Sequence, residues 1–128
     1  ALHFEFTNYE TYLSNQICEI LQEGQELPNK TYECALSKMQ NLRMLFDTLS
    51  NDFDALVTPS SPGIPPKKGD GTGDPIFNRT WSLLGVPAVN VPGLSSDGGY
   101  PIGVQVIAGF RQDAKALSVA QWLEDRLA

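Results

Sequence analysis

The sequence predicts an α/β protein built from a small mixed three-stranded sheet with flanking helices. Four segments carry apolar residues at helical spacing, and three short apolar runs have the length of strands, with glycine and proline around them. A length of 128 residues suffices for one hydrophobic core, so we expect a single domain over 1–128. Residues 1–53 should form a helical pair, and residues 54–128 a strand-helix-strand-strand-helix series.

Two helices are expected in the first 53 residues. Apolar side chains recur at every fourth position: Tyr9, Leu13, Ile17 and Leu21. We therefore predict a helix over 9–23, ended by Gly24. A second helix should begin at Thr31, a good N-cap residue, and reach Leu49, with an apolar stripe suited to packing against another helix.

The first strand is expected within Asp54–Pro59, where Ala55, Leu56 and Val57 form an apolar run that suits burial on both faces. The next segment, 60–74, is rich in Pro, Gly, Ser and Lys and has no apolar period. A loop of this length is usually functional or mobile, which makes it the first place to look for a site.

A third helix is predicted over 75–84, with Asp74 as its N-cap, Pro75 at its first position and Gly85 at its end. A strand over 88–91 should follow and stop at Pro92-Gly93.

The segment "SSDGGYP" is typical of a turn and leads into a third strand over 102–108. A last helix, capped by Asp113, should run to Leu127. Because a helix joins the first two strands, we expect them to be parallel, whereas the short turn makes the second and third antiparallel. This gives the mixed sheet.

Composition limits the function classes. The net charge is −6 and the only adjacent cations are Lys67-Lys68, so we expect no nucleic-acid surface. We also expect no membrane segment, no secretion leader and a cytoplasmic location. Cys18 and Cys34 lack zinc or redox spacing and are interpreted as reduced thiols. Because the chain begins with Ala1, we expect a piece of a longer protein.

The candidate catalytic groups each have a simpler structural interpretation. His3 has no G-x-S-x-G serine to form a triad with. The lysines of "PPKK" lie in a Pro/Gly loop, where a charged, exposed state argues against a role as base for Ser60 or Ser61. "GDGTGDP" carries two aspartates that would repel phosphate, and "SSDGG" is explained as a turn. We expect no metal and no cofactor.

Three segments together resemble the C-terminal part of the amidase signature family. They are "FDALVTPSSPGIPP", "GTGDPIFNRTWSLLGVPAVNVPG" and "YPIGVQVIAGFRQDAKALSVAQWLEDRL". The resemblance covers about 9–127 and is strongest from Asp54 onward. It implies that this chain is a fragment of the larger amidase α/β fold, similar to part of an amidase or of the amidase-like component of an amidotransferase.

The resemblance also implies where the chemistry lies. Enzymes of this family hydrolyse or transfer amide nitrogen with a serine, a second serine in a cis peptide, and a lysine, all located upstream of the part that this chain resembles. No catalytic residue is carried over, so we expect the chain to be inactive alone. Its partners would be the N-terminal catalytic part of the same protein and a small amide substrate.

The resemblance places one wall of the substrate pocket in this chain. The positions that match are Ser60, Ser61, Pro62, Gly63, Phe77 and Trp81. For Phe77 and Trp81, simple core packing is the alternative interpretation.

Two further hypotheses stay open. The chain would instead be a non-catalytic binding or regulatory module with an amidase-derived fold, working as a homodimer, or it would belong to the amide-transferring component of aminoacyl-tRNA amidation. The acidic composition offers no RNA-binding face for the last of these.

We predict that the isolated chain forms a dimer or higher oligomer, because a three-stranded fragment leaves strand edges and apolar surface uncovered. Multi-angle light scattering checks this directly. A single species at the monomer mass of 14.0 kDa would contradict the prediction.

Overall fold

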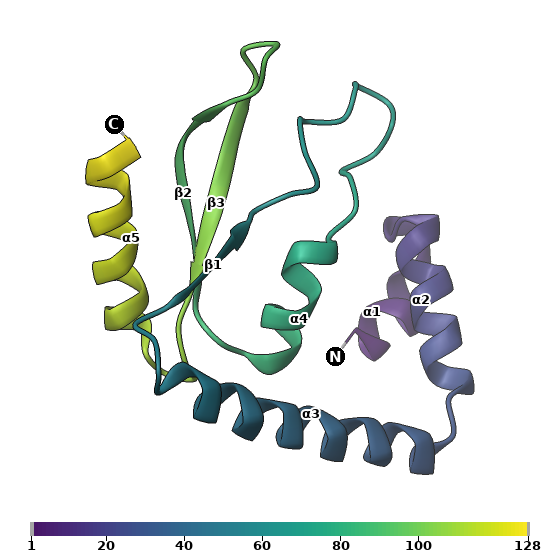
Figure 1. Ribbon diagram of the computed structural model, residues 1–128. Helices are drawn as coiled ribbons and strands as arrows, with labels where there is room; N and C mark the ends of the chain where they lie inside the picture. Colours follow the sequence, from purple (N-terminus) through teal and green to yellow (C-terminus); the bar gives the residue numbers. More distant parts are fainter. Residues whose placement is uncertain (1, 128) are drawn as a thin grey trace. The chain divides into compact units, whose positions relative to one another are not determined.

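The computed structural model describes residues 2–127 (Figure 1). The chain divides into two compact units, residues 1–38 and 39–128, and the division falls inside helix α3 (Asn29–Ser50). Among the described residues, no helix is both long enough and apolar enough to cross a bilayer.

The first unit is helical, but not as one helix over 9–23. It contains α1 (His3–Tyr9), the 3₁₀ turn η1 (Glu10–Tyr12) and α2 (Asn15–Glu26). The predicted single helix is wrong because Ser14 has extended backbone and caps α2, its hydroxyl accepting a hydrogen bond from the Ile17 N–H. Gly24 lies within α2, which ends before Leu27-Pro28, where the residue preceding proline leaves the helical region.

The long helix α3 confirms the second helical prediction, with one correction at its start. Thr31 is not the N-cap, since it lies inside the helix and donates its backbone N–H to the Pro28 carbonyl at 2.9 Å. Pro28 therefore supplies the first carbonyl acceptor of this helix, whose N–H groups otherwise lack partners.

The sheet of the second unit contains β1 (Leu56–Pro59), β2 (Ala88–Ser95) and β3 (Pro101–Ile107). The α/β class, with a three-stranded sheet and flanking helices, is confirmed. The strand order is β1-β3-β2 and both hydrogen-bonded pairs are antiparallel, so the predicted mixed sheet is wrong. β1 and β2 do run in the same direction, but β3 lies between them and pairs with each.

Both outer strands differ from the predictions because they are edges among the described residues. β1 is not buried on both faces: Leu56 is 40% and Val57 49% exposed. β2 does not stop at Pro92-Gly93 but continues to Ser95 through a register shift between Val91 and Leu94. An edge strand tolerates proline, whose missing N–H costs no ladder bond there.

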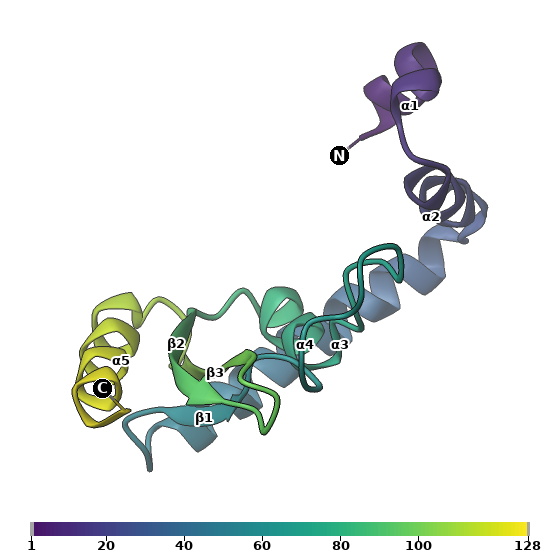
Figure 2. The same cartoon turned by 90° about the horizontal axis from the view of Figure 1, so that it is seen from above.

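Helices cover both faces of the sheet (Figures 1 and 2). On one face, α5 (Asp113–Leu127) packs its alanines against β2 and β3, with Val91, Val106 and Ala120 forming the buried centre. On the other, α4 (Ile76–Leu84) and the end of α3 surround a second centre. Its buried members are Leu84, Val86 and Ile107. Alternating residues of β3 therefore serve two separate cores.

The ends of α4 and α5 agree with the predictions to within one residue. Pro75, not Asp74, is the N-cap of α4, and its carbonyl accepts from the Asn78 N–H at 2.8 Å. Gly85 ends α4 in the left-handed region with φ of 65°, as predicted. Asp113 is the first helical residue of α5 and not its cap, because the Gln112 carbonyl accepts the Ala116 N–H.

We predict that Gly93→Ala destabilises the second unit. Gly93 has φ of 130°, and an added Cβ would lie 2.8 Å from the Leu127 Cβ. We expect the free energy of unfolding to fall by roughly 1–3 kcal/mol, measured by urea unfolding. Gly63→Ala is the matched control, since nothing lies within 4 Å of the added carbon. Equal effects of the two substitutions would refute this account of the β2–α5 contact.

Candidate functional site

A polar pocket of about 360 Å³ opens in the second unit where the end of β1, helix α4 and strands β2 and β3 come together. Six of the residues that line it have hydrogen-bonding side chains: Ser60, Asn78, Trp81, Ser82, Asn90 and Gln105. The other three have no polar side-chain atom: Gly85, Val86 and Ala88. We call this hollow the amide-lined pocket. Its volume lies in the range of small-molecule sites.

Gln105 is the buried polar centre of the pocket, with 3% of its surface exposed. Its Nε2 donates to the Pro59 carbonyl at 3.1 Å and to the Phe77 carbonyl at 2.6 Å. These carbonyls belong to the end of β1 and to α4. One carboxamide on the central strand therefore fixes both ends of the loop over 60–75.

Two asparagines extend this hydrogen-bonding system to the loop. The Ser60 hydroxyl donates to Oδ1 of Asn90 on β2 at 2.5 Å, and Nδ2 of Asn78 donates to the Ser60 carbonyl at 3.1 Å. Gly103 makes room for this arrangement, since a side chain there would collide with the Asn90 amide. Ser60 is thus held from two sides at the start of the loop.

Trp81 of helix α4 lines the amide-lined pocket. Its ring packs against Phe46, with centroids 5.6 Å apart, and its Nε1 is buried without a hydrogen-bond partner among residues 2–127. Arg43 secures the C-terminal end of α4 because its Nε donates to the Leu84 carbonyl at 2.6 Å. A cation near a helix C-terminus is favourable for the helix dipole.

The residues predicted for the substrate wall divide between two places. Ser60 and Trp81 line the amide-lined pocket, and Phe77 contributes its carbonyl to Gln105 beside it. The remaining three line a separate loop hollow of about 400 Å³: Ser61, Pro62 and Gly63. The core-packing alternative also holds in part for Trp81, whose ring joins the cluster around Leu84.

Sequence reasoning missed Asn78, Asn90 and Gln105. A signal for Gln105 was present, since it is the one amide in an otherwise apolar strand and a buried polar side chain needs partners. Asn90 carried the same signal, as the one amide in the apolar strand predicted over 88–91. Asn78 carried none, because exposed asparagines are ordinary near helix starts.

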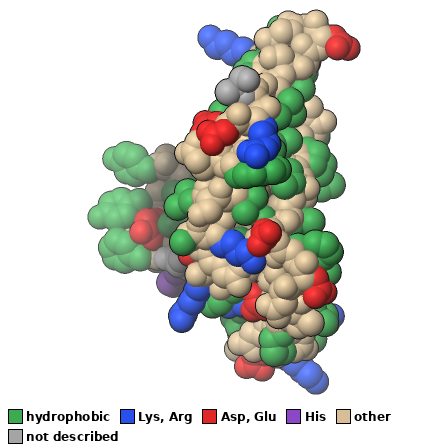
Figure 3. Space-filling model, turned by 60° about the vertical axis from the view of Figure 1, so that its left-hand side comes forward, with side chains coloured by type: hydrophobic (Ala, Val, Ile, Leu, Met, Phe, Trp, Pro, Cys, Tyr) green, Lys and Arg blue, Asp and Glu red, His purple; other side chains and the backbone are tan. Residues whose placement is uncertain are grey.

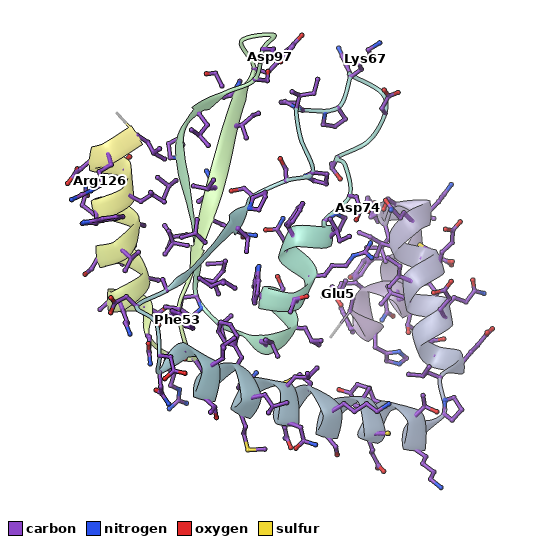
Figure 4. The ribbon with its side chains drawn as sticks, in the orientation of Figure 1. Glu5, Phe53, Lys67, Asp74, Asp97 and Arg126 are labelled. Carbon is purple, nitrogen blue, oxygen red and sulfur yellow. The ribbon has the colours of Figure 1, made fainter. Side chains whose placement is uncertain are left out.

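Lys67 and Asp97, from two of the segments dismissed as catalytic, are not among the residues that line this pocket. Lys67 stands at the tip of the loop, at the end furthest from α4, and Asp97 stands in the β2–β3 turn (Figure 4). The turn is held by backbone bonds and by the Ser96 hydroxyl, which accepts from the Tyr100 N–H. Within residues 2–127, no three His, Cys, Asp or Glu side chains gather as metal ligands.

The surface carries mixed charge. In the face shown in Figure 3, acidic and basic side chains alternate, with hydrophobic side chains between them. The described residues form no continuous cationic patch on this face.

Comparison with known proteins identifies the family. The Amidase family profile matches residues 5–117, which is most of the chain. The chain belongs to the amidase family. The structure supports this, because it superposes on a crystal structure of an amidase with a TM-score of 0.85 at 28% identity, covering 99% of this chain and 32% of that one.

Curated relatives carry a more specific name. The A subunit of the glutamyl-tRNA(Gln) amidotransferase of Koribacter versatilis is 38% identical over 108 residues, covering 76% of this chain and 22% of that protein. Its counterpart in Pelagibacter ubique, which has the same name, is 30% identical, covering 97% of this chain and 28% of that protein. This amidase-family chain therefore spans about a quarter of the length of these relatives.

We predict that Gln105→Leu destabilises the pocket, because the partly buried carbonyls of Pro59 and Phe77 lose their donor. The free energy of unfolding should fall by about 2–4 kcal/mol, and proteolysis within the loop over 60–75 should accelerate. Gln121→Leu on the exposed face of α5 is the control, with an expected change below about 0.5 kcal/mol. If the loop of Gln105→Leu were cleaved at the wild-type rate, the conclusion that Gln105 fixes both ends of the loop would be wrong.

Proposed function

We propose that this chain is the C-terminal portion of an amidase-family enzyme that acts on carbon–nitrogen amide bonds. In this proposal it supplies scaffold and one wall of the substrate pocket. The amide-lined pocket carries the proposal, because it is concave, polar and located at the start of the loop that the family resemblance assigns to the substrate. Loops at strand ends commonly hold ligand sites, since the scaffold positions them rigidly.

The proposed reaction is the hydrolysis of an amide or the transfer of its nitrogen. The names of relatives include both an amidase and a glutamyl-tRNA(Gln) amidotransferase, and both reaction types break an amide carbon–nitrogen bond. The substrate wall comprises Ser60 and Trp81 in the amide-lined pocket, with Ser61, Pro62 and Gly63 in the loop hollow beyond it.

The nucleophile and its base would come from the preceding catalytic portion of the same enzyme. A serine nucleophile requires a base within hydrogen-bond reach, about 2.6–3.2 Å. The hydroxyl of Ser60 instead donates to an amide oxygen, and that of Ser61 donates to the Gly63 carbonyl. Neither bond would activate a serine, because a neutral amide oxygen does not remove a proton.

We predict that the purified chain releases no ammonia from simple aliphatic and aromatic amides above the uncatalysed background. The physical reason is that neither loop serine is paired with a base. A coupled ammonia assay at several enzyme concentrations checks this. Turnover that rises with concentration and is abolished by Ser60→Ala, Ser61→Ala or Lys67→Ala would overturn the proposal.

A chimera tests the scaffold role itself. In the amidase of the superposed crystal structure, the matching third of the chain is replaced by this sequence. We expect the chimera to hydrolyse the parent amide, and the Lys67→Ala chimera to do so equally, because Lys67 lies at the loop tip. A folded chimera without activity would contradict the proposal.

A further inference from the structure

We propose that Asp97-Gly98 is a site of spontaneous covalent modification, at which the aspartate isomerises to isoaspartate, and that the product opens the outer end of the β2–β3 hairpin. The site is independent of the amidase role proposed above. Three features of the described residues support it: the dipeptide at the hairpin tip, the hydrogen bonds that close the turn, and the pairing of the two strands that enter it.

The β2–β3 connection is a three-residue hairpin loop, Asp97-Gly98-Gly99. The Ser96 N–H donates to the Tyr100 carbonyl at 2.9 Å, and the Gly99 N–H donates to the Ser96 carbonyl at 2.9 Å. The angle φ is positive at Gly99, with a value of 76°, but not at Gly98. Three-residue hairpins commonly combine a type I turn with a left-handed residue in this way.

The reacting atoms of Asp97 and Gly98 are free in this turn. Neither the Asp97 carboxylate nor the Gly98 N–H has a hydrogen-bond or ion-pair partner among residues 2–127. Both residues are exposed, and Figure 4 shows Asp97 at the hairpin tip. Because glycine has no side chain, its backbone adopts conformations that other residues avoid, and its nitrogen is open to the preceding carboxyl group.

The reaction needs no reactant other than water. The Gly98 nitrogen forms a bond to Cγ of the protonated Asp97 carboxyl group, while the carboxyl hydroxyl and the nitrogen's proton leave together as water. Water then opens the five-membered imide at one of its two carbonyls. Opening at Cγ restores aspartate. Opening at the main-chain carbonyl leaves the chain linked through Cγ, and that main-chain carbonyl becomes a free carboxylate.

Isoaspartate lengthens the hairpin loop by one backbone atom, because the chain then runs through Cβ and Cγ of residue 97. The register of a hairpin depends on the length and turn type of its loop. The bonds that Ser96 makes with Gly99 and Tyr100 fit a loop of three ordinary residues. We therefore expect these closing bonds to be lost in the isomerised chain.

The opening should stay at the outer end of the hairpin. Two strand pairs, Leu94–Ile102 and Ser95–Pro101, lie between the loop and the register shift in β2. On the other side of the shift, Val91 is 2% exposed and belongs to the core beneath α5. This buried contact holds the rest of the strand pairing in place.

The chain offers an internal comparison at Asp70-Gly71, a second Asp-Gly dipeptide. It lies in the loop over 60–75, which joins β1 to α4 and closes no hairpin. The cost of closing a flexible loop depends only weakly on its length, so one more backbone atom there is tolerated. Isomerisation at Asp70 should therefore leave the sheet unchanged.

The first measurement ages the 128-residue chain in neutral buffer at body temperature for several weeks. Electron-transfer fragmentation of its peptides then maps isoaspartate, because the two linkages break at different backbone bonds. We expect isoaspartate at position 97, preceded by an imide that is lighter than the parent chain by one water. A chain with no isoaspartate at position 97 overturns the proposal, whatever the level at position 70.

Hydrogen exchange tests the structural consequence on isomerised chains separated by chromatography. Exchange of the Ser96, Gly99 and Tyr100 N–H groups should accelerate at least about tenfold, because their bonds in the turn are lost. The amides of β3 over 104–107 should exchange as in the fresh chain.

Aged Asp97→Glu is the matched control for this second measurement. It keeps the negative charge, but the same ring closure would need a six-membered ring, so its turn amides should keep their protection. Chains isomerised only at position 70 should also keep it. Unchanged protection in chains isomerised at position 97, or an equal loss of protection in aged Asp97→Glu, overturns the proposal.

Discussion

The hydrogen bonds of one buried carboxamide join the two ends of the long loop beside the amide-lined pocket. Gln105 lies on the central strand, and its Nε2 reaches the carbonyls of Pro59 and Phe77. Because both carbonyls flank the long loop, a single side chain sets where that loop leaves the sheet and where it rejoins α4. The loop is long and rich in glycine, so ordering it costs conformational entropy, and the bonds of Gln105 restrict it at both ends.

The central position of β3 makes this possible. One face of β3 packs Val106 against α5, and the other carries Ile107 into the cluster around α4. Gln105 faces the α4 side, where its amide replaces water as the donor to two partly buried carbonyls. The same strand therefore supplies apolar side chains to both cores and the donor for two backbone carbonyls. As a result, the pocket forms next to the most deeply buried part of the core.

The rest of the surface leaves sheet edges and large apolar side chains uncovered among the described residues. Both outer strands are edges among the described residues, and large apolar side chains are exposed on α3 and α5, including Leu45 at 66% and Trp122 at 54%. The relatives that the chain matches are several times longer. Within the proposed role, the catalytic portion would cover part of this apolar surface, as uncovered patches of this kind usually mark interfaces.

The sequence by itself determined three of the helices and the family, but not the break at Ser14 before α2. Helical periodicity located α3, α4 and α5, and Gly85 marked a helix end, because these signals depend only on neighbouring residues. The order of the motifs along the chain indicated the amidase family. Only the tertiary structure decided the strand order, since β3 inserts between two strands that the chain separates by a helix. It also decided the pocket, because Asn78, Asn90 and Gln105 are far apart in sequence and meet only when the sheet forms.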